Sequence, residues 1–99
     1  MLVHTVYFWL DPKLSAQERS EFKKDVEILG TLKSIEKAYL GIPAPTVKRP
    51  IIDDSYSVAL TVIFKDMAAH DVYQTDPGHL AFIAKWKATW TKVQIYDAI

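Results

Sequence analysis

Residues 56–66, YSVALTVIFKD, are typical of a β-strand in which both faces are apolar. Successive side chains of a strand point to opposite sides of the sheet. One side therefore carries Tyr56, Val58, Leu60, Val62 and Phe64, and the other carries Ser57, Ala59, Thr61 and Ile63. Residues 2–10 repeat the pattern, with His4, Val6, Phe8 and Leu10 opposite Val3, Thr5, Tyr7 and Trp9. An antiparallel sheet with one wet face shows polar residues there, so we expect both faces to be covered.

The remaining segments supply helices and the other strands. They are a helix over 15–30, strands over 34–42 and 91–99, a short helix over 66–75 and a further helical piece over 76–90. Ser15 followed by Glu18 is a capping box at the start of the first helix. The short helix is predicted to turn Ala69, Val72 and Tyr73 inward.

The element order β-α-β-β-α-β predicts an α+β, ferredoxin-like domain spanning residues 1–99. In this fold a four-stranded antiparallel sheet carries helices on one face. Because the chain has helices for only one face, the open face is predicted to pack on another copy, giving a homodimer and a dimeric α+β barrel. Residues 43–55 form a long loop with three prolines, and such a length hints at a functional or interfacial role.

Charge and cysteine content exclude several classes of partner. Lys and Arg number 12, as do Asp and Glu, so neither nucleic acid nor an anionic membrane is expected as the main partner. The chain has no cysteine, which excludes disulfides and thiolate zinc sites. The apolar residues 1–12 lack the features of a signal peptide and are too short to span a bilayer. The cytoplasm is therefore the expected compartment.

The stretch YQTDPGHLAF, residues 73–82, combines two groups that can move protons with a helix start. Asp76 is predicted to be the N-cap of the helix, Pro77 its first residue and His79 its third. Burial and the positive helix end both favour a neutral imidazole, which can act as a general base. Tyr73 ends the preceding helical piece and can donate a hydrogen bond to a developing oxyanion. Tyr73 and His79 are the predicted catalytic pair.

A ligand pocket is predicted between the helices and the sheet, because His4, Tyr73 and His79 converge on one apolar layer. Its predicted lining is His4, Phe8, Val58, Leu60, Leu80, Phe82, Ile83, Trp86 and Trp90. No metal site is predicted, since His4, His79 and Asp76 lack tight ligand spacing. No phosphate loop, dinucleotide fingerprint or Ser or Cys nucleophile motif is present, so no cofactor is predicted.

The same residues also have a purely structural interpretation. A single histidine on the stripe formed by His79, Ile83, Trp86 and Trp90 is more often a core residue than a catalyst. Tryptophans four residues apart are likewise more often core than a cofactor box. His70 is predicted to lie on the exposed side of its helix without a role.

Four segments, VHTVYFWLD, YSVALTVIFKD, DVYQTDPGHLAF and KVQIYDAI, together resemble the stress-responsive A/B barrel (Dabb) family over essentially the whole chain. The resemblance implies a dimeric α+β barrel in which two four-stranded sheets face each other. It also implies kinship with plant polyketide cyclases and, more distantly, with small monooxygenases and muconolactone isomerases.

In the cyclases a tyrosine and a histidine serve as an acid–base pair, and those positions match Tyr73 and His79; a histidine near the N-terminus matches His4. The chain departs from the cyclase pocket at Lys23, Val26, Val58 and Asp76, where the cyclases have two aromatic residues and two histidines.

Three functions fit these residues. The first is a stress-response type barrel that binds a small apolar ligand. The second is a cofactor-independent cyclase or isomerase of a polyketide-like or aromatic substrate, with His79 as base and Tyr73 as acid or oxyanion donor. The third is a small haem- or quinol-type monooxygenase. The residues leave open whether the protein is an enzyme.

Overall fold

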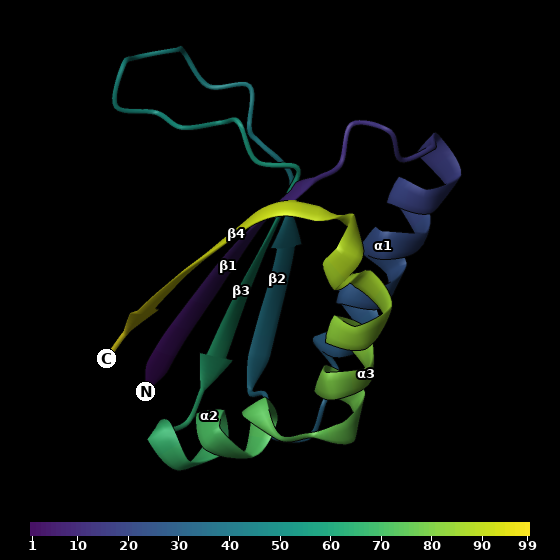
Figure 1. The fold of residues 1–99 in the computed structure, drawn as a ribbon. Coiled ribbons are helices and arrows are strands. Elements are labelled where there is room, and N and C mark those ends of the chain that lie inside the picture. The colour runs from purple at the N-terminus through teal and green to yellow at the C-terminus, as the bar shows by residue number, and fades with distance from the viewer.

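The computed structural model describes residues 1–99 as a single sheet with helices on one side (Figure 1). The elements in chain order are β1 (Leu2–Leu10), α1 (Ala16–Leu29), β2 (Lys37–Gly41), β3 (Val58–Phe64), α2 (Met67–Gln74), α3 (Pro77–Trp86), the 3₁₀ turn η1 (Lys87–Thr89) and β4 (Trp90–Ala98). None of the helices combines the length and the apolar character that crossing a membrane requires.

The sheet is antiparallel, with the strand order β2-β3-β1-β4. This confirms the predicted ferredoxin-like α+β fold. Helices α1 and α3 run side by side over one face, and α2 lies at the end of the sheet where β1 begins (Figure 1). The register places His4 opposite Val62 on β3 and opposite Asp97 on β4. The central strand therefore sets the cross-strand neighbours of the first histidine.

The two predicted faces of the central strands separate as expected. Along β1 and β3 every second residue is buried and the residues between are half-buried. The buried set faces the helices, where Phe22, Val26 and Leu29 of α1 meet Phe82 and Trp86 of α3. The other face, which we call the open face, carries no helix. Its strand residues are Lys37, Tyr39, Gly41, Ala59, Thr61, Ile63, Val3, Thr5, Tyr7, Trp9, Lys92, Gln94, Tyr96 and Ala98.

Each of the three α-helices begins with an N-cap residue of a type that is common at helix starts. Ser15 accepts from the backbone N–H of Glu18 at 3.1 Å, and Glu18 returns the bond to the Ser15 N–H at 3.0 Å, which confirms the capping box. Asp66 caps α2 by accepting from the Ala69 N–H at 2.9 Å. Asp76 caps α3, and Pro77 occupies its first position as predicted.

The third helix is shorter than predicted. It ends at Trp86, and Thr89 donates its hydroxyl to the Trp86 carbonyl at 2.6 Å within the following 3₁₀ turn. Trp90 is then the first residue of β4 and pairs with Leu10, so its predicted place on a helical stripe with His79 was wrong. Sheet pairing overrode a helical spacing that was only local.

The inward side of α2 also differs from the prediction. Tyr73 is buried and Ala69 packs against the core, but Val72 is 59% exposed. His70 takes the inward place, with only 13% of its side chain exposed, so its predicted exposure was wrong. Positions 70 and 72 lie on either side of the helical stripe formed by Ala69 and Tyr73, so either residue could face the core. The prediction chose Val72 over His70 because valine is the more hydrophobic of the two.

Candidate functional site

A cavity of about 140 Å³ lies between the helices and the sheet. It is lined by His4, Val6, Phe8, Leu29, Leu60, Tyr73, Gln74, His79, Phe82, Ile83, Trp90, Val93 and Ile95. The lining is mostly hydrophobic, with the polar groups drawn from β1, α2 and α3. It includes the predicted pair Tyr73 and His79 together with His4.

Three of the predicted lining residues lie elsewhere. Val58 is buried in the core opposite Phe8. Trp86 is also buried, and its indole N–H donates to the Asp25 carboxylate at 2.8 Å. Leu80 is 52% exposed, on the outer side of α3. These side chains do not contact the cavity, because two of them fill the core and the third turns away from it.

The helix break between α2 and α3 brings Tyr73 and His79 together. Asp76 accepts from the Gly78 N–H at 2.8 Å, which fixes the start of α3 and places His79 in its first turn. The ring centroids of Tyr73 and His79 are 4.3 Å apart, with an angle of 36° between the planes. The two rings are therefore in direct contact across the break.

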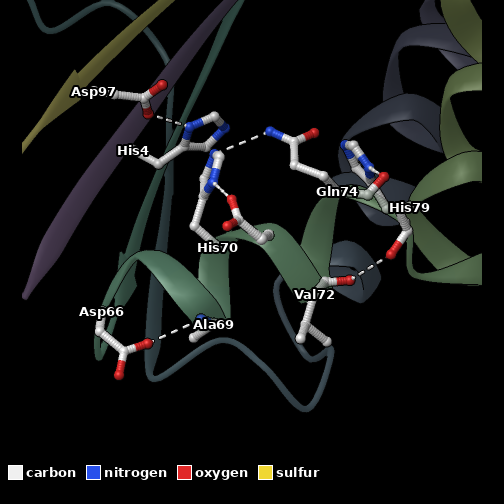
Figure 2. A network of polar contacts seen from close by, with 10 residues as sticks. His4, Asp66, Ala69, His70, Val72, Gln74, His79 and Asp97 are labelled. Atoms are coloured by element: carbon white, nitrogen blue, oxygen red, sulfur yellow. Dashed lines mark hydrogen bonds and ion pairs between the residues drawn. The ribbon is translucent and has the colours of Figure 1, made fainter.

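The backbone fixes the tautomer of His79. Its Nδ1 lies 3.3 Å from the carbonyl oxygen of Gln74 (Figure 2). A carbonyl can only accept, so Nδ1 carries the proton and Nε2 keeps its lone pair. Burial lowers the pKa of His79, and the neighbouring His4 and His70 act in the same direction. The Gln74 carbonyl and Asp76 oppose that lowering. His79 is thus a neutral base near pH 7, and it is half-buried, which is less than its place on an apolar helical stripe predicts.

Tyr73 is a proton donor, in contrast to the basic His79. Burial raises its pKa far above the ordinary value, and the Asp76 carboxylate adds to the effect. The phenol is therefore protonated near pH 7. A protonated phenol beside a neutral imidazole is a hydrogen-bond donor next to a base.

His4 is buried and held by a carboxylate from the edge strand. Its Nδ1 is 2.5 Å from Oδ1 of Asp97, the residue opposite it on β4 (Figure 2). Its ring centroid is 6.1 Å from that of Tyr73 and 5.5 Å from that of His70. Asp97 and His70, which contact His4, were not among the predicted site residues. For Asp97 the only signal in the sequence is its place in the segment KVQIYDAI, since cross-strand register is not visible there.

One buried donor in this region has no partner. The indole Nε1 of Trp90 is buried without a hydrogen bond, although Trp90 lines the cavity. A buried donor left unpaired costs on the order of 1–3 kcal/mol. The buried indole N–H therefore adds a cost to the packing beside the cavity.

Comparisons with known proteins agree with this architecture. The family model for the Stress responsive A/B Barrel Domain (Dabb) matches residues 2–99. No protein with a curated description matches the chain. A dabb family protein with a ferredoxin-like fold from Mesorhizobium loti is 26% identical, with a TM-score of 0.80 over 99% of this chain and 94% of that one.

Two further solved structures show how varied proteins of this fold are. A hydroxynitrile lyase from Passiflora edulis is 17% identical, with a TM-score of 0.83 over 99% of this chain and 91% of the lyase. A dimeric ferredoxin-like protein of unknown function from Thermobifida fusca is 12% identical, with a TM-score of 0.78 over 98% and 88% of the two chains. At these identities the likeness is one of fold.

The lowered pKa of His79 predicts a pH-dependent loss of stability. Above about pH 6.5, the ordinary value, the ring is neutral in both the folded and the unfolded chain, so the shift has no effect. As the pH falls below that value the unfolded chain takes up the proton first, and the free energy of unfolding decreases. We expect wild type to lose more stability than His79→Gln between pH 7 and pH 5 in urea titrations.

Proton NMR gives the control. The resonance that disappears in His79→Gln should titrate below about 6.5. A midpoint above 7 would instead make His79 a cation paired with Asp76 and would contradict a base role.

Proposed function

The chain belongs to the stress-responsive A/B barrel domain family, and from that premise we propose that it is a homodimer that binds a small apolar ligand in the cavity beneath α3. The observation that carries the proposal is an apolar cavity with Tyr73, His79 and His4 in its wall. Ligand sites combine a mostly hydrophobic lining with a few polar groups that fix orientation. The cytoplasm stays the expected compartment.

The size of the cavity limits the ligand. A volume of about 140 Å³ is close to the ~150 Å³ of an apolar cavity that accepts one benzene molecule. We therefore propose a ligand with one aromatic or alicyclic ring rather than an extended polyketide. A porphyrin is larger than this volume, so the haem-dependent alternative would require the cavity to open. The Tyr73 phenol and the His79 imidazole in the lining favour a ligand with a carbonyl or hydroxyl oxygen.

A matched pair of probes tests ligand binding. Acetophenone and ethylbenzene have nearly the same shape, but only acetophenone offers an acceptor oxygen. We expect acetophenone to shift the NMR signals of cavity residues and to bind at least tenfold more tightly than ethylbenzene. Ile83→Trp, which fills the cavity, should abolish binding. Leu80→Trp, an equal enlargement on the exposed side of the same helix, should not.

Equal binding of acetophenone to both variants would place the ligand outside this cavity. Equal affinity for acetophenone and ethylbenzene would show that the polar groups of the cavity do not contribute to binding.

The contact between Tyr73 and His79 favours a second candidate function, proton abstraction next to a carbonyl. In this step the C–H bond breaks, its proton passes to Nε2 of His79, and the electron pair moves to the carbonyl oxygen. That oxygen then accepts a hydrogen bond from the Tyr73 phenol. A cofactor-independent cyclase or isomerase needs this step first. A hydroxynitrile lyase shares the fold, which supports the idea only as an analogy.

Deuterium exchange into the methyl group of acetophenone tests the chemistry without knowledge of the natural substrate. If His79 is the base, wild type should accelerate exchange in D₂O and His79→Gln should be roughly 100-fold slower or worse. Tyr73→Phe should also be slower, while Leu80→Trp should match wild type. Exchange that survives in His79→Gln would assign the protein to ligand binding alone.

The open face supports the dimer. Its residues on β1 and β3 are half-buried in one chain and mostly apolar or hydroxylated, among them Tyr7, Trp9 and Thr61. A hollow of about 290 Å³ on this face is lined by Tyr7, Trp9, Asp53, Tyr56, Lys92, Gln94 and Tyr96. Sheet-to-sheet packing of two copies would cover this surface, and a structural neighbour is described as dimeric.

The predicted dimer depends on the centre of the open face. Thr61→Arg places an unpaired charge there, in an interface expected to bury on the order of 2,000 Å². We expect this variant to sediment as a monomer at low micromolar concentration, where wild type is a dimer. Ser20→Arg makes the same change of charge on the exposed side of α1 and should stay dimeric. A monomeric wild type would remove the proposal.

A further inference from the structure

Two histidines and a carboxylate meet at the end of the sheet where α2 approaches β1 and β4 (Figure 2). A ring nitrogen of His4, a ring nitrogen of His70 and a carboxylate oxygen of Asp97 all lie within 4.8 Å of one another. The three residues come from β1, α2 and β4, so the cluster exists only in the folded chain. The group lies on the helix side of the sheet, away from the open face.

We propose that His4, His70 and Asp97 bind a divalent transition-metal ion of the zinc class. Imidazole nitrogen and carboxylate oxygen are the donors that suit Zn²⁺ in the absence of cysteine. Donor atoms around a tetrahedral Zn²⁺ at 2.0–2.2 Å lie about 3.4 Å from one another. Closure from 4.8 Å to that spacing requires shifts of roughly 1 Å, which side-chain rotations supply.

The neighbours of His70 orient its ring and leave one ring nitrogen free of a proton for a metal ion. Asp71 lies 3.1 Å from its Nδ1, and the side-chain nitrogen of Gln74 lies 3.0 Å from its Nε2. An amide nitrogen only donates, so Nε2 holds a lone pair and Nδ1–H is directed at the carboxylate. Metal-ligating histidines have this pattern, with a carboxylate on the nitrogen that does not bind the ion. The ion would displace the Gln74 amide.

Access and charge also fit an ion from solvent. The Asp97 side chain is 45% exposed, while His4 is 3% exposed and gives the site a rigid inner wall. An ion bound by His4 and Asp97 takes the place of the proton between them, and that proton is released. Three protein ligands leave a fourth position for water or a small molecule, as in catalytic zinc sites. Because His4 also lines the cavity, the fourth position of the ion would lie near the cavity wall. The proposed metal site does not depend on the proposed ligand.

The test uses the full chain without a histidine tag, first stripped of metal with EDTA and dialysed. Calorimetric titration with Zn²⁺ should show one ion per chain, and Zn²⁺ should raise the melting temperature. Co²⁺ in place of Zn²⁺ should give visible absorption bands of a protein-bound ion. His70→Gln and Asp97→Asn should each weaken binding at least tenfold and reduce the thermal shift.

Two further variants separate this site from general histidine binding. Asp71→Ala, which removes only the outer hydrogen-bond partner of His70, should weaken binding by about 10- to 100-fold. His79→Gln removes the histidine that is not a ligand and should bind as wild type does. Circular dichroism checks that each variant is folded. Absence of saturable Zn²⁺ binding in wild type, or unchanged binding in His70→Gln, would overturn the proposal.

Discussion

The register of the central strand β1 is the constraint on which the rest of this structure depends. Its pairing with β3 and β4 puts His4, Val6 and Phe8 under the helices, and it sets Asp97 opposite His4. A slip of one residue would turn that whole row to the open face. The register is held because the row facing the helices is fully buried, whereas the opposite row is only half-buried. One pairing pattern therefore builds both the core and the wall of the cavity.

Polar groups inside the apolar layer are the second theme. Each of the three histidines has a partner: Asp97 for His4, Asp71 and Gln74 for His70, and the Gln74 carbonyl for His79. A layer built for stability alone could use hydrophobic residues in these places, since well-packed apolar residues in place of a buried ion pair are often neutral or stabilising. The unpaired indole of Trp90 adds a cost. Such exceptions gather at functional sites in natural proteins.

The two faces of the sheet carry different kinds of residue. The helix face carries the cavity and the histidines, and the open face carries tyrosines, threonines and small residues suited to contact with a second sheet. Proteins that share this fold at low sequence identity can keep the same arrangement of helices and strands while the residues that line the cavity change. In this chain the helix break at Asp76 and Pro77 sets the positions of two wall residues, Tyr73 and His79.

Local signals in the sequence determined the strands, the caps and the faces. Strict alternation in residues 2–10 and 56–66, the Ser15 capping box and the Asp76-Pro77 start are short-range patterns, and they predicted the fold and the contact between Tyr73 and His79. Only the tertiary structure decided that Trp90 begins a strand, that His70 rather than Val72 turns inward, and that Asp97 reaches His4. Those outcomes depend on contacts between residues that are as many as 93 positions apart in the chain, and no local propensity encodes such a distance.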